Sequence, residues 1–285
     1  MSMKKSDFFQ LFPSLSLRQK QHILEKITGF TTDQLFFIDE ILVDLSEIKR
    51  VENMIWDWVP FEYIVESSEF YWYDFFVDKR CLIPRNDTEI MVSECLNSLW
   101  KESYSLIDVG TGSSCIPISV YLESQKKWKI LENNSVVDIS PLALEVSQIN
   151  LKKYQLDWVF QQIQSDLLEY FLETNKVSLW KNLLITANLP YIKDNDFQNM
   201  DSNVYNHEPS LALYWWKETW FELYEKLVDQ IFQLKIQYNC EKIIAFFEIW
   251  FDQYEYSQKF LSQKWLKFEY FQDMAKIHRC IKIEF

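Results

Sequence analysis

The sequence predicts an α/β protein in which a doubly wound parallel sheet follows a small helical domain. Beyond Pro84, short apolar segments that end in polar residues alternate with helical patterns, which is typical of βαβ units with right-handed crossovers. Before Pro84, apolar residues first recur at helical spacing and then give way to an aromatic, β-branched stretch. We therefore expect a helical bundle over residues 1–66, a β-hairpin connector over residues 67–84 and the α/β domain over residues 85–285.

Composition and charge are those of a folded, acidic protein. Of the 285 residues, 48% are apolar and 25% are charged, which argues against a disordered chain. No apolar run approaches the ~20 residues that cross a bilayer, so no membrane association is expected. The net charge of −13 argues against nucleic acid as a direct partner, because phosphate binding needs a basic surface. The five cysteines lack CxxC spacing, and residues 1–10 have no apolar stretch long enough for a secretory signal, so we expect a cytoplasmic protein without disulfides.

Two helices are predicted in the N-terminal part. An amphipathic helix is expected over Leu15–Ile27, and Gly29 is placed to end it. Thr32-Asp33 can cap a second helix over Leu35–Leu45. No catalytic constellation is visible in this part of the sequence, so a small helical bundle is the simplest interpretation.

Four short apolar segments of the α/β domain are the predicted strands: Ser105–Val109, Ser135–Ile139, Val159–Leu167 and Leu183–Ala187. Helical patterns over Cys115–Gln125 and Pro141–Tyr154 separate the first three strands. One polar residue lies near the end of each strand or directly after it, and these residues are Asp108, Asp138, Asp166 and Asn188. Because ligands bind beyond the carboxyl ends of parallel strands, we expect the four polar side chains to converge on one site.

A glycine-bearing turn between the first strand and the following helix is the first sign of a ligand site. It contains Asp108, Gly110, Thr111, Gly112, Ser113 and Ser114. Glycines let a ligand approach the backbone and a helix N-terminus offers free N–H groups, although the same turn can form without a ligand. Asp138 can accept both ribose hydroxyls of a nucleotide-like cofactor or cap the following helix. Asp166 can meet an adenine amino group or cap a helix.

The candidate catalytic and substrate-binding residues follow the fourth predicted strand and are Asn188, Leu189, Pro190 and Tyr191. The Asn188 side-chain oxygen and the neighbouring main-chain carbonyl can form a two-acceptor clamp for an NH₂ group, because the proline restricts the chain. Tyr191 offers a flat face to a planar amide or base. The structural alternative is a proline turn with a buried tyrosine.

These motifs resemble those of S-adenosylmethionine-dependent methyltransferases that act on a planar NH₂ nitrogen. Five segments narrow the resemblance, because they are similar to IPRPETE, DLGTGSGCIALS, EPRLAL, EIGxxQ and DLAGxDR of the release factor glutamine methyltransferase family, in that order. The five segments are Ile83–Glu89, Asp108–Ser119, Glu208–Leu213, Phe247–Gln253 and Asp273–Arg279. The resemblance runs from about residue 50 to the end and implies a Rossmann-like class I methyltransferase fold.

The resemblance implies a reaction and a partner. The family transfers a methyl group from S-adenosyl-L-methionine to the side-chain amide nitrogen of the glutamine in the GGQ motif of peptide chain release factors. Asn188 and the Leu189 carbonyl would accept the two amide hydrogens. Pro190 would fix the loop, and Tyr191 would pack against the amide plane. The helical N-terminal domain is then expected to recognise the release factor.

The resemblance also implies a set of cofactor contacts. Gly110–Ser114, preceded by Asp108, would hold the methionine portion of the cofactor, and Asp138 would hold the ribose. Asp166-Leu167 would border the adenine, and Asn188 would lie beside the bound cofactor. His22, His207 and His278 lack the spacing of metal ligands, so no metal site is expected.

The chain departs from the family mainly at glycine positions. Roughly 20 glycines are expected at an average content of about 7%, but the sequence has three, together with twelve tryptophans. Ser114 and Lys276 also replace family glycines, and Leu189 replaces the first proline of the NPPY motif while keeping its carbonyl. Seven tryptophans stand where the family has glycine: Trp58, Trp72, Trp215, Trp216, Trp220, Trp250 and Trp265. We hypothesise that many tryptophan positions are glycine in the native protein, encoded by UGA codons read as glycine.

Two other functions stay open at the level of the sequence. Adenine-N6 methyltransferases of DNA or RNA use a similar clamp on a flipped base, but such proteins usually have a basic groove. A non-catalytic paralogue that keeps the fold is the other alternative, and genuine tryptophans at turn positions would favour it.

Overall fold

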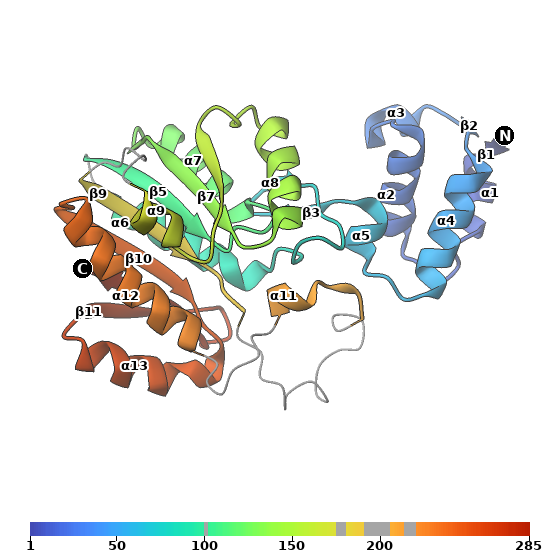
Figure 1. The fold of residues 1–285 in the computed structure, drawn as a ribbon. Coiled ribbons are helices and arrows are strands. Elements are labelled where there is room, and N and C mark those ends of the chain that lie inside the picture. The colour runs from blue at the N-terminus through green and yellow to red at the C-terminus, as the bar shows by residue number, and fades with distance from the viewer. Residues whose placement is uncertain (100–101, 175–180, 191–205, 214–220) are drawn as a thin grey trace. The chain divides into compact units, whose positions relative to one another are not determined.

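The structure is a computed structural model, and it describes residues 1–99, 102–174, 181–190, 206–213 and 221–285 (Figure 1). The chain divides into two compact units. The first contains Met1–Ser67, and the second contains the described residues from Ser68 onward except Asn206 and His207. None of the described helices is long and apolar enough to cross a membrane.

Short helices and a two-stranded sheet make up Met1–Ser67. The helices are α1 (Lys5–Gln10), α2 (Leu17–Thr28), α3 (Thr32–Phe36), α4 (Leu45–Trp56) and α5 (Phe61–Val65), and the strands are β1 (Ser2–Lys4) and β2 (Glu40–Leu42). Their shared core includes Phe8, Ile23, Leu24, Ile41 and Ile64. The prediction for α2 is confirmed, because a capping box at Ser16 starts the helix and Gly29, with a φ of 73°, ends it.

The predicted second helix over Leu35–Leu45 is wrong. Helix α3 ends at Phe36, and Glu40–Leu42 forms β2, which pairs antiparallel with β1. Ile41 is buried while its neighbours on either side are exposed, which is the period of two that a half-buried strand requires. Burial of Ile41 in the core therefore decides the structure of a segment too short for a helical pattern to be informative.

The second unit begins with an antiparallel hairpin of β3 (Ser68–Phe70) and β4 (Tyr73–Phe75). Its loop consists of Tyr71 and Trp72, whose φ values are 49° and 70°. Two positive φ values in a two-residue loop are those of a type I′ turn, in which Asn-Gly is strongly preferred. The hairpin therefore places a tryptophan at a position that favours glycine.

A mostly parallel sheet forms the centre of the second unit. Its strands are β5 (Ser103–Val109), β6 (Ile130–Leu131), β7 (Asn134–Asp138), β8 (Phe160–Gln164), β9 (Asn182–Ala187), β10 (Lys242–Glu248), β11 (Lys267–Gln272) and β12 (His278–Glu284). The order is β11-β12-β10-β9-β5-β7-β8, with β6 paired to β5. The strands from β10 to β8 in this order are parallel, whereas β12 is antiparallel to both β10 and β11. The four predicted strands are β5, β7, β8 and β9, which confirms the doubly wound, Rossmann-like sheet.

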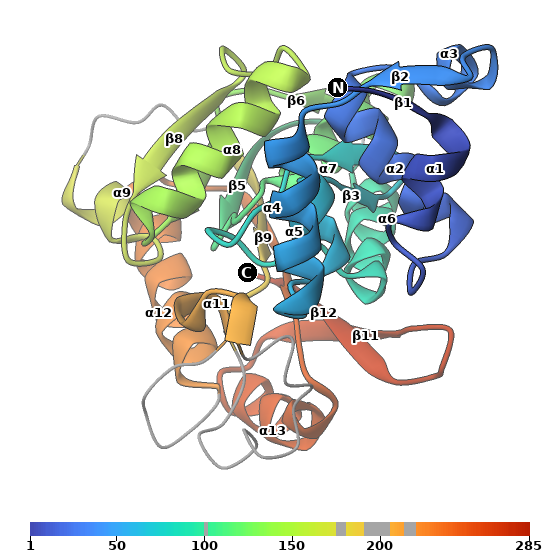
Figure 2. The same ribbon diagram turned by 90° about the vertical axis from the view of Figure 1, so that its right-hand side faces the viewer.

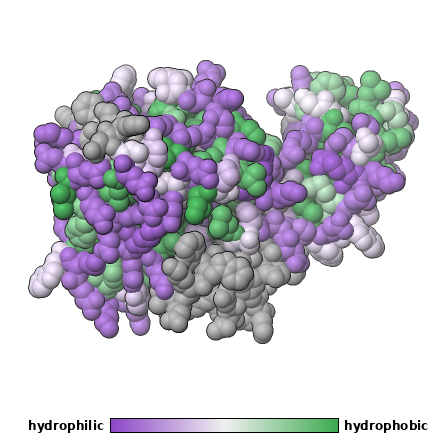
Figure 3. Space-filling view, viewed as in Figure 1, coloured by the Kyte–Doolittle hydropathy of each residue, from purple (hydrophilic) through white to green (hydrophobic). Residues whose placement is uncertain are grey.

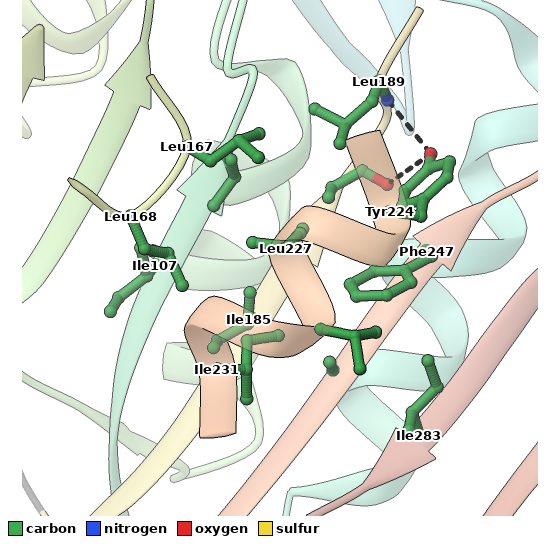
Figure 4. Packing of buried hydrophobic residues seen from close by; sticks show 14 of the residues in the cluster. Ile107, Leu167, Leu168, Ile185, Leu189, Tyr224, Leu227, Ile231, Phe247 and Ile283 are labelled. Atoms are coloured by element: carbon green, nitrogen blue, oxygen red, sulfur yellow. Dashed lines mark hydrogen bonds between the residues drawn. The ribbon is translucent and has the colours of Figure 1, made fainter. Parts of the chain in front are cut away.

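Helices cover both faces of this sheet (Figures 1 and 2). They are α6 (Glu89–Ser98), α7 (Cys115–Lys126), α8 (Pro141–Lys153), α9 (Glu169–Glu173), α12 (Glu222–Gln237) and α13 (Tyr254–Gln263), with α11 (Ser210–Leu213) and the 3₁₀ turns η1 (Asn86–Thr88) and η3 (Phe251–Gln253) in the connections. Ile107 of β5 packs with Leu227 of α12 on one face (Figure 4), whereas Leu106 packs with α6 and α7 on the other. Both faces of the central strands are thus apolar, as a buried parallel sheet requires.

The strand order reverses beside β5. From β5 the chain proceeds to β7 and β8 on one side and then crosses to β9 and β10 on the other. At such a switch point the loops beyond the carboxyl ends diverge and leave a crevice that binds ligands in doubly wound sheets. The fold therefore predicts a ligand site at the loops that follow β5, β7, β8 and β9.

The described tryptophans are unusually placed. The surface in the view of Figure 3 is mostly hydrophilic, yet all seven described tryptophans are exposed. Tryptophan is highly buried in most proteins. Four of the seven also have φ values between 55° and 70°, in the left-handed region, and their side chains are 73% to 94% exposed: Trp58, Trp72, Trp128 and Trp265.

The glycine hypothesis can be compared with these backbone angles. Trp58, Trp72 and Trp265 have the backbone that glycine favours, as the hypothesis requires. Trp250 has a φ of −81°, so its conformation does not call for glycine. Of the other tryptophans named in the hypothesis, Trp215, Trp216 and Trp220 lie outside the described residues.

We expect replacement of Trp128 or Trp265 by glycine to raise the free energy of unfolding by about 0.5–1 kcal/mol each. The gain arises because a left-handed backbone strains a side chain with a Cβ, and neither exposed ring loses a buried contact. Thermal unfolding of the single variants measures this. Trp158→Gly is the matched control, because Trp158 is exposed without a positive φ and should only lose stability. Equal losses at all three positions would contradict the hypothesis, as would codons other than UGA at the tryptophan positions.

Candidate active site

A cavity lies at the carboxyl ends of the central strands. The sequence-predicted residues that line it are Gly110, Thr111, Gly112, Ser113, Asp138, Asp166, Leu167, Asn188, Leu189 and Pro190. They come from the last residue of β7 and from the loops after β5, β8 and β9, so the fold brings together residues up to about 80 positions apart in the sequence. Asp108 and Ser114 are not among the lining residues, and Tyr191 lies outside the described part of the chain.

The glycine loop is bonded to the neighbouring strand. The N–H groups of Gly110 and Thr111 both donate to the Val137 carbonyl at 2.9 Å. A Cβ on residue 110 would lie 2.9 Å from Leu189 Cδ2, whereas a Cβ on Gly112 would meet nothing within 4 Å. Both glycines have positive φ values, 72° and 52°. The loop therefore packs directly against Leu189 at its first glycine and faces open space at its second.

Asp138 connects this loop to the end of β7. Its Oδ2 accepts a hydrogen bond from the Gly112 N–H and its Oδ1 accepts one from the Ser140 N–H, each at 2.9 Å. Burial raises the pKa of the carboxyl above its ordinary value, and these two N–H groups oppose the shift. Each carboxylate oxygen has two acceptor sites. Asp138 can therefore anchor the loop and still accept a hydrogen bond at each oxygen from a ligand hydroxyl.

Asp108 and Ser114 support the loop from within the fold. Asp108 is buried, and its Oδ1 accepts a 2.6 Å hydrogen bond from the Thr186 hydroxyl of β9. Burial raises the pKa of Asp108 to about 6, although hydrogen bonds from Thr111 and Thr186 lower it. Ser114 has a φ of 62° and donates to the Ser147 hydroxyl at 2.6 Å. A direct contact of either residue with a cofactor stays a prediction.

Asp166 and Leu167 form the edge of the cavity beyond β8. Asp166 Oδ2 accepts a 2.7 Å hydrogen bond from the ammonium group of Lys226 on α12, so a cation already engages this carboxyl. Leu167 has a φ of 53°, a conformation that costs on the order of 1 kcal/mol for a residue with a side chain. Such strain clusters at ligand clamps, and Leu167 lines the cavity.

The two residues that carry the candidate amide acceptors, Asn188 and Leu189, are held by hydrogen bonds that their own N–H groups donate. Asn188 Nδ2 donates to Thr88 Oγ1 at 3.5 Å, which leaves Oδ1 as the acceptor of this side chain. The Leu189 N–H donates to the Tyr224 hydroxyl at 3.1 Å (Figure 4). The Tyr224 hydroxyl in turn donates to the main-chain carbonyl of Glu248. Both residues of the clamp are therefore bonded to side chains from distant parts of the chain.

Three side chains of this region were not assigned a role from the sequence. Thr88 and Arg85 line the cavity and belong to the Ile83–Glu89 segment. The Arg85 guanidinium pairs with the buried carboxylate of Glu208 at 2.5 Å. Glu248 ends β10 and is buried. Their membership of the matched segments was the available signal, but a one-dimensional motif does not tell which of its residues face the site.

Several proteins with similar sequences are release factor glutamine methyltransferases. The protein of that name from Mycoplasma mycoides subsp. mycoides SC is 34% identical over 215 residues, which are 75% of this chain and 69% of that protein. The one from Lactococcus lactis subsp. lactis is 30% identical over 210 residues, which are 73% of this chain and 71% of that protein. The Bacillus subtilis protein is 36% identical over 175 residues, which are 60% of this chain and 57% of that protein.

Solved structures give more distant matches. The ribosomal protein L11 methylase of Lactobacillus delbrueckii subsp. bulgaricus has a TM-score of 0.44 and 14% identity, covering 70% of this chain and 79% of that chain. The TrmK protein of M. capricolum, solved with S-adenosyl-homocysteine, has a TM-score of 0.42 and 14% identity, covering 68% of this chain and 66% of that chain. No protein-family model matches the chain. The Mycoplasma and Lactococcus proteins share about a third of their aligned residues with this chain, over more than two thirds of both proteins. The chain therefore belongs to the release factor glutamine methyltransferase family.

Proposed function

We propose that this protein transfers a methyl group from S-adenosylmethionine to the side-chain amide nitrogen of the glutamine in the GGQ motif of a peptide release factor. The observation that carries the proposal is that Asn188 and Leu189, whose oxygens can accept from an NH₂ group, line the same cavity as the glycine loop and Asp138. Family membership supports the same reaction. Because translation ends in the cytoplasm, we propose that location for the reaction. We further propose that residues 1–66 contribute to recognition of the release factor.

The residues of the glycine loop and Asp138 suit this cofactor. Gly112 faces open space, and Asp138 keeps an acceptor site on each oxygen for the two ribose hydroxyls. We assign the methionine portion to the glycine loop and the adenine to Asp166 and Leu167. When bound, S-adenosylmethionine supplies a methyl group on a sulfonium sulfur, which is open to in-line attack by a nitrogen lone pair.

Orientation is the main contribution of the clamp. An amide nitrogen is a poor nucleophile because its lone pair is delocalised into the carbonyl. Asn188 Oδ1 and the Leu189 carbonyl would accept its two N–H groups and so hold the nitrogen in one direction, and proximity and orientation can remove several kcal/mol from a barrier. The same two oxygens would disperse the positive charge that develops on the nitrogen as the new N–C bond forms. As the N–C bond forms, the S–C bond of the cofactor would break, S-adenosylhomocysteine would leave, and the extra proton on the nitrogen would pass to solvent, so this alignment needs no side-chain base.

Transfer of a labelled methyl group to an intact release factor tests the proposal. We expect the label on the GGQ glutamine, and we expect no label when that glutamine is replaced by alanine. Adenine-containing DNA and RNA serve as competing substrates in the same assay. Label on adenine instead of the release factor would assign the protein to nucleic acid, and calorimetric binding of the cofactor without transfer to any substrate would identify a non-catalytic paralogue.

A further inference from the structure

We propose that Glu248 is a positioning residue that orients both amide acceptors of the active site, Asn188 through the Thr88 hydroxyl and Leu189 through the Tyr224 hydroxyl. Glu248 is not among the residues that line the cavity, so it acts through these two hydroxyl groups. The inference rests on the proposed function for its purpose, because the orientation of the acceptors matters only where an amide nitrogen binds.

The first connection, here called the first arm, links Glu248 to Asn188 through side chains. The Glu248 carboxyl lies close enough to the Thr88 hydroxyl for that hydroxyl to lower the pKa of the carboxyl, and Thr88 Oγ1 also contacts Asn188 Nδ2 at 3.5 Å. A carboxylate can only accept, so the Thr88 hydroxyl donates its single proton to ionised Glu248. Thr88 Oγ1 is then left as an acceptor, which selects the Nδ2 end of the Asn188 amide and turns Oδ1 away from Thr88. Ionised Glu248 therefore sets which end of the Asn188 amide is available to a substrate.

The second arm links the main-chain carbonyl of Glu248 to the Leu189 N–H through the Tyr224 hydroxyl. The Tyr224 hydroxyl donates to the main-chain carbonyl of Glu248 and accepts from the Leu189 N–H at 3.1 Å. Tyr224 is buried and stacks on Phe247, with ring centroids 4.9 Å apart, so the hydroxyl has a fixed position. A peptide group is planar, so a bond at the Leu189 N–H limits the rotation of the segment that carries the Asn188 and Leu189 oxygens. The two arms therefore meet at residue 248, the first at its carboxylate and the second at its main-chain carbonyl.

Burial of the Glu248 carboxyl is energetically unfavourable. It is 5% exposed, and its Oε2 has no hydrogen-bond partner in the part of the chain that the structure describes. A buried carboxyl with unused hydrogen-bonding capacity lowers stability, which calls for an explanation other than folding. The charged groups that act on it are Arg85, Asp87 of η1 and Arg279 of β12, and Glu248 itself raises the pKa of the facing Cys280 thiol. The two arginines favour the carboxylate and Asp87 opposes it.

Protonation of Glu248 would reverse the direction of the hydrogen bonds in the first arm. Burial raises the pKa of Glu248 to about 7, although the hydrogen bond to Thr88 and the charge of Arg279 lower it. A protonated carboxyl can donate to Thr88, and the Thr88 hydroxyl is then free to donate to Asn188 Oδ1. That bond would occupy the oxygen that the substrate amide needs. We therefore expect the rate of methyl transfer at saturating substrates to rise as the pH rises through about 7 and to level off above it.

Variants of the two arms separate positioning from general damage. We expect Thr88→Val to lower kcat by about 10-fold and to remove the pH dependence near 7, because the hydroxyl that links Glu248 to Asn188 is gone. Thr88→Ser should restore both. Tyr224→Phe should lower kcat but keep the pH dependence, because only the second arm is cut. Glu248→Gln should lose the pH dependence, and Glu132→Gln, which changes an exposed carboxylate, should behave as the wild type. Calorimetric affinity for S-adenosylmethionine should stay unchanged in Thr88→Val.

A spectroscopic readout tests the network without cofactor or release factor. The side-chain ¹⁵NH₂ signal of Asn188, identified by its absence in Asn188→Asp, should shift with pH around a midpoint near 7 in the wild type and stay constant in Glu248→Gln. A wild-type rate in Thr88→Val, or a titration of this signal that survives Glu248→Gln, would overturn the inference. Titration of the signal in a protein that fails to methylate release factors would instead leave the network standing and refute the proposed function.

Discussion

Replacement of Asn188 by alanine is expected to lower kcat for release-factor methylation by about 100-fold or more, the size of effect seen when one preorganised charge-stabilising contact is removed. The side-chain oxygen is one of two acceptors proposed to hold the substrate NH₂ group, and alanine has no atom in its place. Steady-state methyl transfer with a GGQ-containing release factor measures the loss. Affinity for S-adenosylmethionine, measured by calorimetry, should change little, because the glycine loop and Asp138 do not depend on this side chain.

The matched control for this prediction is Asn97→Ala. Asn97 lies on the exposed side of α6, where its side chain donates to Glu94 at 3.4 Å, so its removal should leave turnover unchanged. Full turnover by Asn188→Ala would refute the role of the clamp. An equal loss of cofactor affinity and turnover would show instead that the segment after β9 serves the cofactor.

Replacement of Asp138 by alanine should weaken S-adenosylmethionine binding by about 100-fold or more. The variant would lose the two charge-assisted hydrogen bonds that we propose between Asp138 and the ribose hydroxyls, each contributing about 1.5–3 kcal/mol. It also loses the bonds that anchor the Gly112 and Ser140 N–H groups. Calorimetry of the variant and the wild type measures the change. At saturating cofactor, the KM for the release factor should stay close to that of the wild type, because Asp138 does not touch the clamp.

Two comparisons sharpen the test of Asp138. Asp157→Ala removes an exposed carboxylate just before β8 and should bind the cofactor as the wild type does. Asp166→Ala should weaken binding less than Asp138→Ala, because Lys226 already engages the Asp166 carboxyl. Cofactor affinity of Asp138→Ala within a few-fold of the wild type would remove Asp138 from the proposed site.

The strands that carry the site were predictable because their signal is local. An apolar run such as Leu183–Ala187 is too short for a helix and ends in a polar residue, and a parallel sheet forces such ends to one edge. The cavity indeed gathers Gly112, Asp138 and Asn188. Prediction failed over Leu35–Leu45, because burial of one side chain, Ile41, in a core made by distant residues decided the outcome.

The supporting residues of the site were not predictable for a related reason. Thr88 lies 100 positions before Asn188, and Tyr224 lies 35 positions after Leu189, so their hydrogen bonds exist only once the sheet has formed. Glu248 gave no signal of its own, since a glutamate at a strand end is normally taken to be solvated. The motifs marked where function resides, whereas the three-dimensional structure was needed to show which side chains hold the others.

The backbone at position 110 has a consequence for how this sequence can change over time. A Cβ at residue 110 would lie 2.9 Å from Leu189 Cδ2, but that carbon is the free end of a leucine side chain and can shift. The φ of 72° at residue 110, by contrast, strains any residue with a Cβ whatever side chain occupies position 189. Residue 110 should therefore stay a glycine among descendants of this gene even where residue 189 changes.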